Sequence, residues 1–268
     1  MQISISTGCL HHLPPDQIAD MAVAAGFQCV EVLLNGGLMQ NIEAMRLALR
    51  SRGLTVSAVH APFYLDWLLS APGKQDEAMT AASAVIEAAV QFEAPILTIH
   101  PGKSPPLGIP AREYIETAES NLASIRKAAA QQGMELLLEN TAGLYFLGIK
   151  IAGQLASSPE EMERFLGPPD APHMFMTFDT SHAFTIKNTT VDGYIYRMNS
   201  RIKSVHLSDT NGLTDHLPIG YGKLDFHRIF SALRNVGFNG NVTLELRPSL
   251  SSLEELRRNR ILVETELL

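Results

Sequence analysis

The chain has 268 residues, with 21 Lys and Arg against 28 Asp and Glu, which gives a formal net charge of −7. Hydrophobic residues make up 46% and charged residues 18% of the sequence, a composition typical of globular domains that excludes disordered and fibrous classes. The acidic balance disfavours binding to a nucleic-acid backbone, which requires clustered cations.

The sequence predicts neither export nor membrane insertion. The first ten residues, MQISISTGCL, lack a basic segment followed by a long apolar one, and the most apolar later stretch, 79–99, is interrupted by Glu87 and Glu93. Cys9 and Cys29 are too few for a disulfide framework and lack zinc-ribbon spacing, so we expect two reduced, buried thiols. These features predict a cytoplasmic protein without a membrane span.

Eight short runs with strand character follow one another along the chain. They cover residues 2–7, 29–34, 55–61, 96–100, 135–140, 174–179, 202–207 and 241–246. Successive runs begin 26 to 41 residues apart, which leaves room for a helix and two loops between strands. This spacing indicates alternating strands and helices of a parallel sheet and excludes a series of hairpins.

The segments between these runs have the character of helices. The run 16–26 places apolar residues on one face and ends at Gly26, and the segments 41–52, 113–132 and 225–236 are each followed by a glycine. A last helix is expected within 251–268.

Eight strands and eight helices without a composition break predict one α/β domain over 1–268, a (β/α)8 TIM barrel. An open doubly wound sheet is the alternative, but no G-x-G-x-x-G motif follows a strand.

The third to eighth predicted strands each end in or next to a residue that can bind a metal or move a proton. These residues are His60, His100, Glu139, Asp179, His206 and Glu245, with His182 just after Asp179 and His216 in the loop after the seventh strand. A single such histidine is more often a core residue bonded to a backbone carbonyl. In a barrel, however, the strand ends meet at one face, so we expect these side chains to converge.

A convergent set of acids and imidazoles predicts a divalent-metal site, because a bound cation offsets the cost of burying several carboxylates together. Mixed nitrogen and oxygen ligands favour manganese or zinc, with cobalt, iron or magnesium as further candidates.

Six strand-end motifs carry a resemblance to a known family. They are HAPF (60–63), HPG (100–102), LENTAG (138–143), DTSHA (179–183), HLSD (206–209) and DHLPIGYG (215–222). In this order they resemble the xylose isomerase-like TIM barrel superfamily. That superfamily joins sugar and sugar-phosphate isomerases and epimerases to AP endonuclease family 2, the endonuclease IV-like enzymes.

The resemblance implies metal ligands residue by residue. Both branches would hold one metal with Glu139, Asp179, His206 and Glu245. In the endonuclease branch, His60, His100 and a bridging Glu139 would hold a second metal. A third metal would use His182, His216 and an aspartate at position 214, which here is Thr214. Because Asp215 is one residue out of register, we expect a partial third site or none.

The favoured reaction is that of a metal-dependent sugar or sugar-phosphate isomerase or epimerase. Glu139 and Glu245 would form the acid/base pair that moves a proton next to a carbonyl, and His182 would contact the substrate. The alternatives are an endonuclease IV-like phosphodiesterase, favoured by His60 and His100, and a catalytically silent metal- or ligand-binding barrel.

The loops around the predicted barrel mouth favour a small substrate. The segments 35–41 and 61–73 contain no Lys or Arg, whereas DNA requires clustered cations. Phe63 and Trp67 would form an apolar wall, and base stacking on DNA is the alternative. Arg247 would hold a substrate hydroxyl or phosphate, unless it forms a structural salt bridge. The apolar loop around Trp67 could also contribute to a homodimer.

Overall fold

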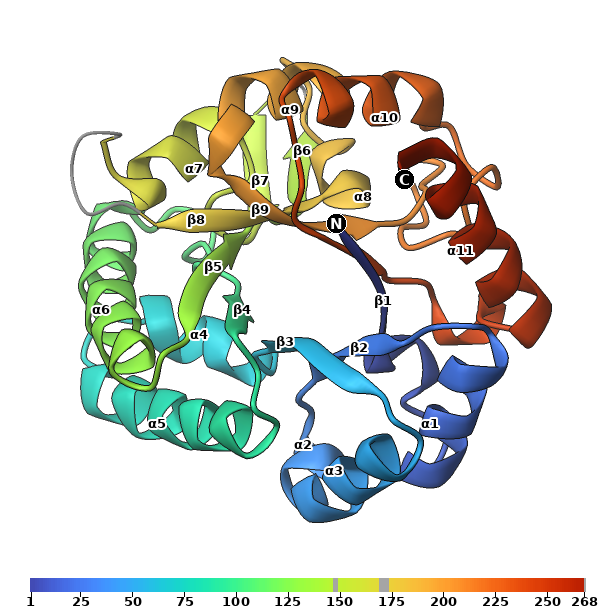
Figure 1. Ribbon diagram of the computed structural model, residues 1–268. Coiled ribbons are helices and arrows are strands. Elements are labelled where there is room, and N and C mark those ends of the chain that lie inside the picture. Colours follow the sequence, from blue (N-terminus) through green and yellow to red (C-terminus); the bar gives the residue numbers. More distant parts are fainter. Residues whose placement is uncertain (147–148, 169–173, 268) are drawn as a thin grey trace.

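A computed structural model of the chain describes residues 1–146, 149–168 and 174–267, and eight parallel strands form a closed barrel at its centre (Figure 1). In order around the barrel they are β1 (Gln2–Ser6), β2 (Cys29–Leu33), β3 (Thr55–His60), β4 (Ile96–Ile99), β5 (Glu135–Glu139), β8 (Phe175–Asp179), β9 (Ile202–Leu207) and β10 (Asn241–Leu244). β1 pairs with β10, which closes the ring. The predicted eight-stranded barrel is confirmed.

Eight principal helices alternate with these strands and surround the barrel (Figure 1). They are α1 (Pro15–Ala24), α3 (Ile42–Ser51), α5 (Gln75–Gln91), α6 (Arg112–Gln131), α7 (Pro159–Leu166), α9 (Val191–Met198), α10 (Phe226–Asn235) and α11 (Leu253–Leu267). Shorter helical turns lie in the connections: η1 (Thr7–Leu10), α2 (Gly36–Met39), α4 (Tyr64–Ser70), α8 (Thr180–Ala183), η2 (Asn199–Arg201) and η3 (Pro248–Leu250). Within the described ranges, no helix is long and apolar enough to cross a membrane.

The two faces of the strands have different partners because side chains alternate along a strand. Outward-facing residues such as Val30, Val32 and Phe178 are fully buried in the hydrophobic cluster between strands and helices. The barrel interior holds small polar side chains. For example, the hydroxyl oxygens of Thr98 on β4 and Thr177 on β8 are 3.2 Å apart. The barrel interior therefore contains polar side chains behind the carboxyl ends of the strands.

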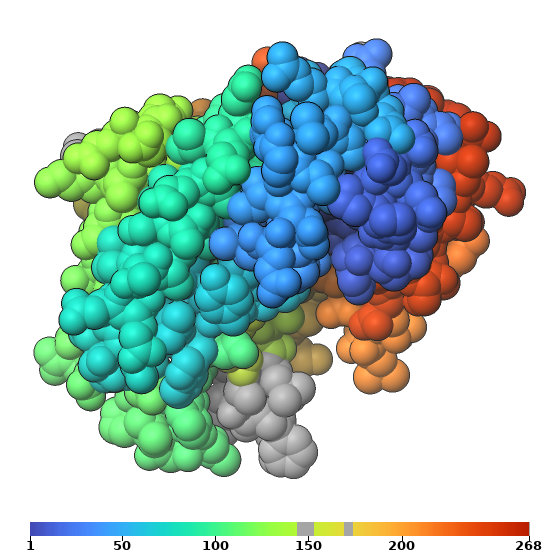
Figure 2. Space-filling model, turned by 90° about the horizontal axis from the view of Figure 1, so that it is seen from below, coloured from blue at the N-terminus to red at the C-terminus, as the bar shows by residue number. Residues whose placement is uncertain are grey.

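The last helix completes the ring beside the first. The guanidinium of Arg260 in α11 donates a hydrogen bond to the carbonyl of Ala25 at 2.9 Å, and Arg257 donates to Ala24 at 2.8 Å. In the space-filling view the red C-terminal segment accordingly lies next to the blue N-terminal one (Figure 2). The two ends of the chain are thus joined into one closed unit.

One element was not expected from the sequence. After β5 the chain forms an antiparallel pair, β6 (Gly143–Phe146) and β7 (Ile149–Gly153), which stands apart from the barrel as a separate two-stranded sheet. The sequence pattern predicts no strand between 140 and 174. A strand of four or five residues in a connecting segment has too few alternating positions to be separated from a loop by its pattern.

Candidate metal centre

The predicted strand-end residues lie together at the carboxyl end of the barrel. Three groups of described side chains have ligand atoms within 4.8 Å of one another. The first contains Glu139, Asp179, His206 and Glu245, the second His60, His100 and Glu139, and the third Asp179, His182 and His216. The convergence expected from the sequence is therefore present, while the role of each residue as a ligand stays a prediction.

The first group is arranged around His206. Its Nδ1 atom lies 2.9 Å from Oε2 of Glu245 and 3.2 Å from Oε2 of Glu139. Asp179 is held by Asn140, whose side chain accepts a hydrogen bond from the Asp179 amide at 2.8 Å and donates one to its carbonyl at 2.9 Å. Asn140 was not singled out from the sequence, although it lies inside the LENTAG motif.

The second group lies on the other side of Glu139. His60 places Nε2 2.9 Å from Glu139 Oε2, and His100 places Nε2 3.5 Å from Glu139 Oε1. The Nδ1 atom of His100 is 3.0 Å from Asp66, a buried carboxylate that also accepts a hydrogen bond from Gln154 at 2.8 Å. Asp66 therefore orients His100, as outer-shell carboxylates orient metal-binding histidines.

The third group contains Asp179, His182 and His216, and whether it holds an ion stays a prediction. His182 Nδ1 lies 3.7 Å from Asp179 Oδ1, and His216 is brought inward by a left-handed backbone with φ of 52°. Asp215 does not join the group because its carboxylate pairs with Arg247 at 2.5 Å.

The loop that carries His216 depends on a close backbone approach. Asp209 accepts hydrogen bonds from the amides of Gly220 at 3.0 Å, Gly222 at 2.8 Å and Leu224 at 3.1 Å. A Cβ atom at Gly222 would lie 2.3 Å from Oδ1 of Asp209, so the second glycine of the GYG sequence is needed for this contact.

The electrostatics of the centre suit bound cations. Burial by itself lowers the pKa of His60, His100, His182 and His206, yet the surrounding carboxylates outweigh burial and raise the pKa of each imidazole. Burial by itself raises the pKa of Glu139 and Glu245, yet the imidazole of His206 and its neighbours lower both values. Positive charge is therefore favoured throughout the centre.

Several buried atoms of the centre have no aligned hydrogen-bond partner among the described residues. They are Oδ2 of Asp179, Oε2 of Glu245, and both ring nitrogens of His206. His206 nevertheless approaches three carboxylates within 3.2 Å. Short contacts without hydrogen-bond alignment are expected where ligand atoms point at a common position, and imidazole with carboxylate suits zinc or manganese. The donor set therefore fits a divalent metal.

Of the four predicted substrate contacts, His182 belongs to the third group. Phe63 lies against the second group, and the amide of Arg247 donates a hydrogen bond to the carbonyl of His216 at 2.7 Å. Phe63 is 51% exposed, and its ring stacks on that of His100 with 5.6 Å between ring centroids. Trp67 is 42% exposed and contacts Tyr114. Arg247 forms the salt bridge with Asp215 that was the alternative to a substrate role; β10 ends at Leu244, so strand alternation does not extend to it.

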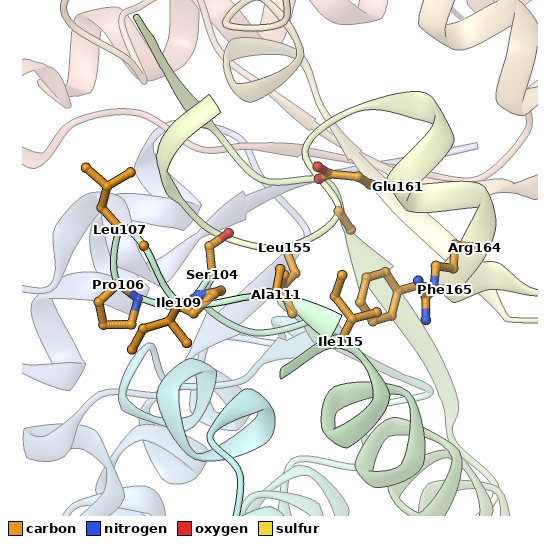
Figure 3. A pocket seen from close by; sticks show the side chains of 13 residues that line it. Ser104, Pro106, Leu107, Ile109, Ala111, Ile115, Leu155, Glu161, Arg164 and Phe165 are labelled. Carbon is orange, nitrogen blue, oxygen red and sulfur yellow. The ribbon is translucent and has the colours of Figure 1, made fainter. Parts of the chain in front are cut away.

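A separate pocket of about 220 Å³ lies between the segment after β4 and helix α7 (Figure 3). Its walls are largely apolar and include Pro106, Leu107, Ile109 and Phe165. It shares no residue with the three groups described above. This pocket is therefore distinct from the candidate metal centre.

The fold and these side chains define a (β/α)8 barrel with a candidate divalent-metal centre at the carboxyl ends of its strands. Residues 19–261 match the family model of the xylose isomerase-like TIM barrel. The chain belongs to this family, as its motifs predicted.

The relatives found by sequence comparison include an uncharacterized protein and a probable endonuclease. An uncharacterized protein of Methanocaldococcus jannaschii is 27% identical over 221 residues, 79% of this chain and 72% of that protein. A probable endonuclease 4 of Natranaerobius thermophilus is 26% identical over 216 residues, 77% of this chain and 68% of that protein. Among solved structures, a D-tagatose 3-epimerase-like protein superposes with a TM-score of 0.81 at 22% identity, covering 100% of this chain and 97% of that one.

Proposed function

We propose that this protein is a divalent-metal-dependent hydrolase of a small phosphoester that uses more than one ion. The observation that carries the proposal is the pair of side-chain groups that share Glu139. Its Oε2 atom faces His60 and His206, while its Oε1 atom faces His100 and His182. A carboxylate that contacts four imidazoles is better suited to bridge two metal ions than to act as a free general base. The 26% identity to a probable endonuclease 4 supports the same reaction class.

The candidate ligands would form two ion sites that share Glu139. Glu139, Asp179, His206 and Glu245 would hold one ion, and His60 and His100 would complete a second site with Glu139. Zinc and manganese suit these ligands best. When bound, such ions polarise phosphoryl oxygens and activate water as the nucleophile. Asp66 and Asn140 keep His100 and Asp179 in place, so that the ligand set is formed before substrate arrives.

A small substrate is favoured over duplex DNA. The segments 35–41 and 61–73 carry no Lys or Arg, and the chain has a net charge of −7. Binding along a phosphate backbone requires several neutralising cations. The exposed ring of Phe63 offers an apolar surface beside the second group, which suits an organic group on the phosphoester.

The proposal is tested by metal analysis together with two substrates. Protein loaded with zinc or manganese should contain at least two ions per chain and hydrolyse bis(p-nitrophenyl) phosphate. It should cleave an abasic-site duplex less efficiently. Glu139→Gln should reduce turnover more than about 100-fold, since loss of an outer-shell partner alone typically costs 10–100-fold. One ion per chain and no phosphoester hydrolysis would exclude the proposal.

A second candidate is a metal-dependent sugar or sugar-phosphate isomerase or epimerase, which the sequence motifs favour. It is supported by Glu139 and Glu245, which both lie within 3.2 Å of His206 and could flank one substrate. The fold similarity to a D-tagatose 3-epimerase-like protein is compatible with it. Incubation of the manganese-loaded protein with ketoses in D2O distinguishes the two, because epimerisation introduces deuterium next to the carbonyl.

A further inference from the structure

Glu31 is a buried carboxylate that the proposed reaction does not use. It lies on β2, which is separated from β9 by β1 and β10, yet its Oε1 atom is 2.8 Å from Nε2 of His206 across the barrel interior. Both side chains are completely buried. Neither oxygen of Glu31 has an aligned hydrogen-bond partner among the described residues.

His206 therefore lies between carboxylates on its two sides. Nδ1 faces Glu139 and Glu245 of the candidate metal centre, while Nε2 faces Glu31. In the other four imidazoles of the centre it is Nδ1 that contacts a backbone carbonyl or Asp66, so the ring of His206 is oriented the other way round. These four are His60, His100, His182 and His216. A neutral imidazole carries its proton on one nitrogen only, so the partner of Nε2 decides whether Nδ1 can act as a ligand.

We propose that Glu31 is a positioning residue whose negative charge, 2.8 Å from Nε2 of His206, favours the proton on that nitrogen and so presents the Nδ1 lone pair to a metal ion. This inference rests on the metal site of the proposed function. Histidine ligands are commonly fixed in this way by a carboxylate on the second nitrogen, which sets the tautomer and increases ligand basicity. The charge of Glu31 also favours a cation at the far side of the ring.

A purely structural role would require Glu31 only to fill space and balance charge. Ser4 and Thr243 form another buried polar pair in the barrel interior, and their hydroxyl oxygens are 2.8 Å apart. Neither residue belongs to the three candidate ligand groups. Ser4→Ala is therefore a matched control for loss of an interior polar group. Glu31→Gln keeps the shape and an acceptor oxygen but removes the charge, whereas Glu31→Leu removes both.

The experiment measures zinc affinity by competition with a chromophoric chelator for the parent chain, Glu31→Gln, Glu31→Leu and Ser4→Ala. We expect affinity to fall about 10-fold in Glu31→Gln and up to about 100-fold in Glu31→Leu, with Ser4→Ala like the parent. Imidazole ¹⁵N spectra of labelled protein should show His206 protonated at Nε2 in the zinc-loaded parent and a changed tautomer population in Glu31→Leu. The ¹⁵N signals of His206 are assigned as those that disappear from the spectrum of His206→Gln.

Parent-like affinity and unchanged His206 signals in both Glu31 variants would overturn the inference. If Glu31→Leu fails to fold, Glu31→Gln alone decides between loss and retention of affinity. A parent chain that binds no zinc would overturn both this inference and the proposed function. Weakened zinc binding in the variants, with no phosphoester hydrolysis by the loaded parent, would leave the role of Glu31 standing and exclude only the proposed reaction.

Discussion

At the scale of single residues, the centre is built from ligand candidates that are each held by a second contact. His60 places Nδ1 2.6 Å from the carbonyl of Ala61, and His182 places Nδ1 3.0 Å from the carbonyl of Asn140. Asp66 does the same for His100 with a charged group. Such contacts fix ring orientation, so that a cation meets ligands that need little rearrangement.

Asp66→Asn tests the second metal site separately from the first. The substitution keeps an acceptor oxygen but removes the negative charge next to His100. We expect the ion of the second site to bind about 10-fold less tightly, while the first site is unchanged. Titration with zinc followed by calorimetry measures both sites. Asp76→Asn, an exposed change in α5, is the control. An equal loss at both sites would contradict the assignment of Asp66 to His100.

Cys9 is a residue whose chemistry is set by burial. Its sulfur accepts a hydrogen bond from the amide of Leu246 at 3.0 Å, next to Glu245 in the chain. Burial raises the pKa of the Cys9 thiol to about 12 and that of the Cys29 thiol to about 11. The reactive thiolate forms only as the pH rises toward these values, so both thiols stay neutral at pH 8.

Native protein should therefore resist alkylation by iodoacetamide at pH 8, whereas protein unfolded in guanidinium chloride should gain two labels. Intact mass after timed quenching gives the result. Cys9→Ser and Cys29→Ser, each unfolded, serve as controls that should take up one label. Rapid labelling of the native chain at pH 8 would show that these thiols are accessible and ionised, contrary to their position in the structure.

At the scale of elements, the sequence predicts the barrel strands well for a physical reason. Parallel strands covered by helices are buried on their outer face, so runs such as ILTIH and ELLLEN are apolar and short, with a charged or imidazole residue where the strand ends. The runs predicted over 55–61, 135–140 and 174–179 correspond to β3, β5 and β8, which end at His60, Glu139 and Asp179.

What the sequence did not predict depends on contacts between distant segments. The β6–β7 pair forms in a connection and leaves no long alternation to detect. Asp66 and Gln154 are 88 positions apart, and their link to His100 follows only from how the connections after β3 and β5 pack together. The contact of Glu31 with His206 across the barrel likewise depends on closure of the strands into a ring.

The loop carrying His216 gives an element-scale prediction. Gly222→Ala would place a Cβ atom 2.3 Å from Asp209 and 2.4 Å from the carbonyl of Thr210, so the loop must shift. We expect a loss of about 2 kcal/mol in the free energy of unfolding, measured by urea denaturation. Gly36→Ala, where the added atom meets nothing within 4 Å, is the matched control and should be neutral. Equal stability of both variants would contradict the packing of this loop.

At the scale of the whole molecule, the barrel concentrates negative charge at one end. Five carboxylates lie in or next to the candidate centre: Glu31, Asp66, Glu139, Asp179 and Glu245. All are at most 14% exposed, so water screens their repulsion poorly. Two divalent ions would supply four positive charges against these five negative ones, which links the stability of the closed barrel to ion binding.

Removal of ions should therefore lower the thermal stability of the entire chain. An ion that binds only the folded state at 100 times its dissociation constant contributes about 2.7 kcal/mol, which for a protein of this size corresponds to a Tm change of about 5–10 °C. Scanning calorimetry of zinc-loaded and chelator-treated protein measures the change.

Calcium, which prefers oxygen ligands, should stabilise the chain less than zinc or manganese, because the imidazoles of His60, His100 and His206 offer nitrogen ligands. Identical unfolding of loaded and stripped protein, with the ion content of each checked, would show that the buried carboxylates are neutralised within the chain itself.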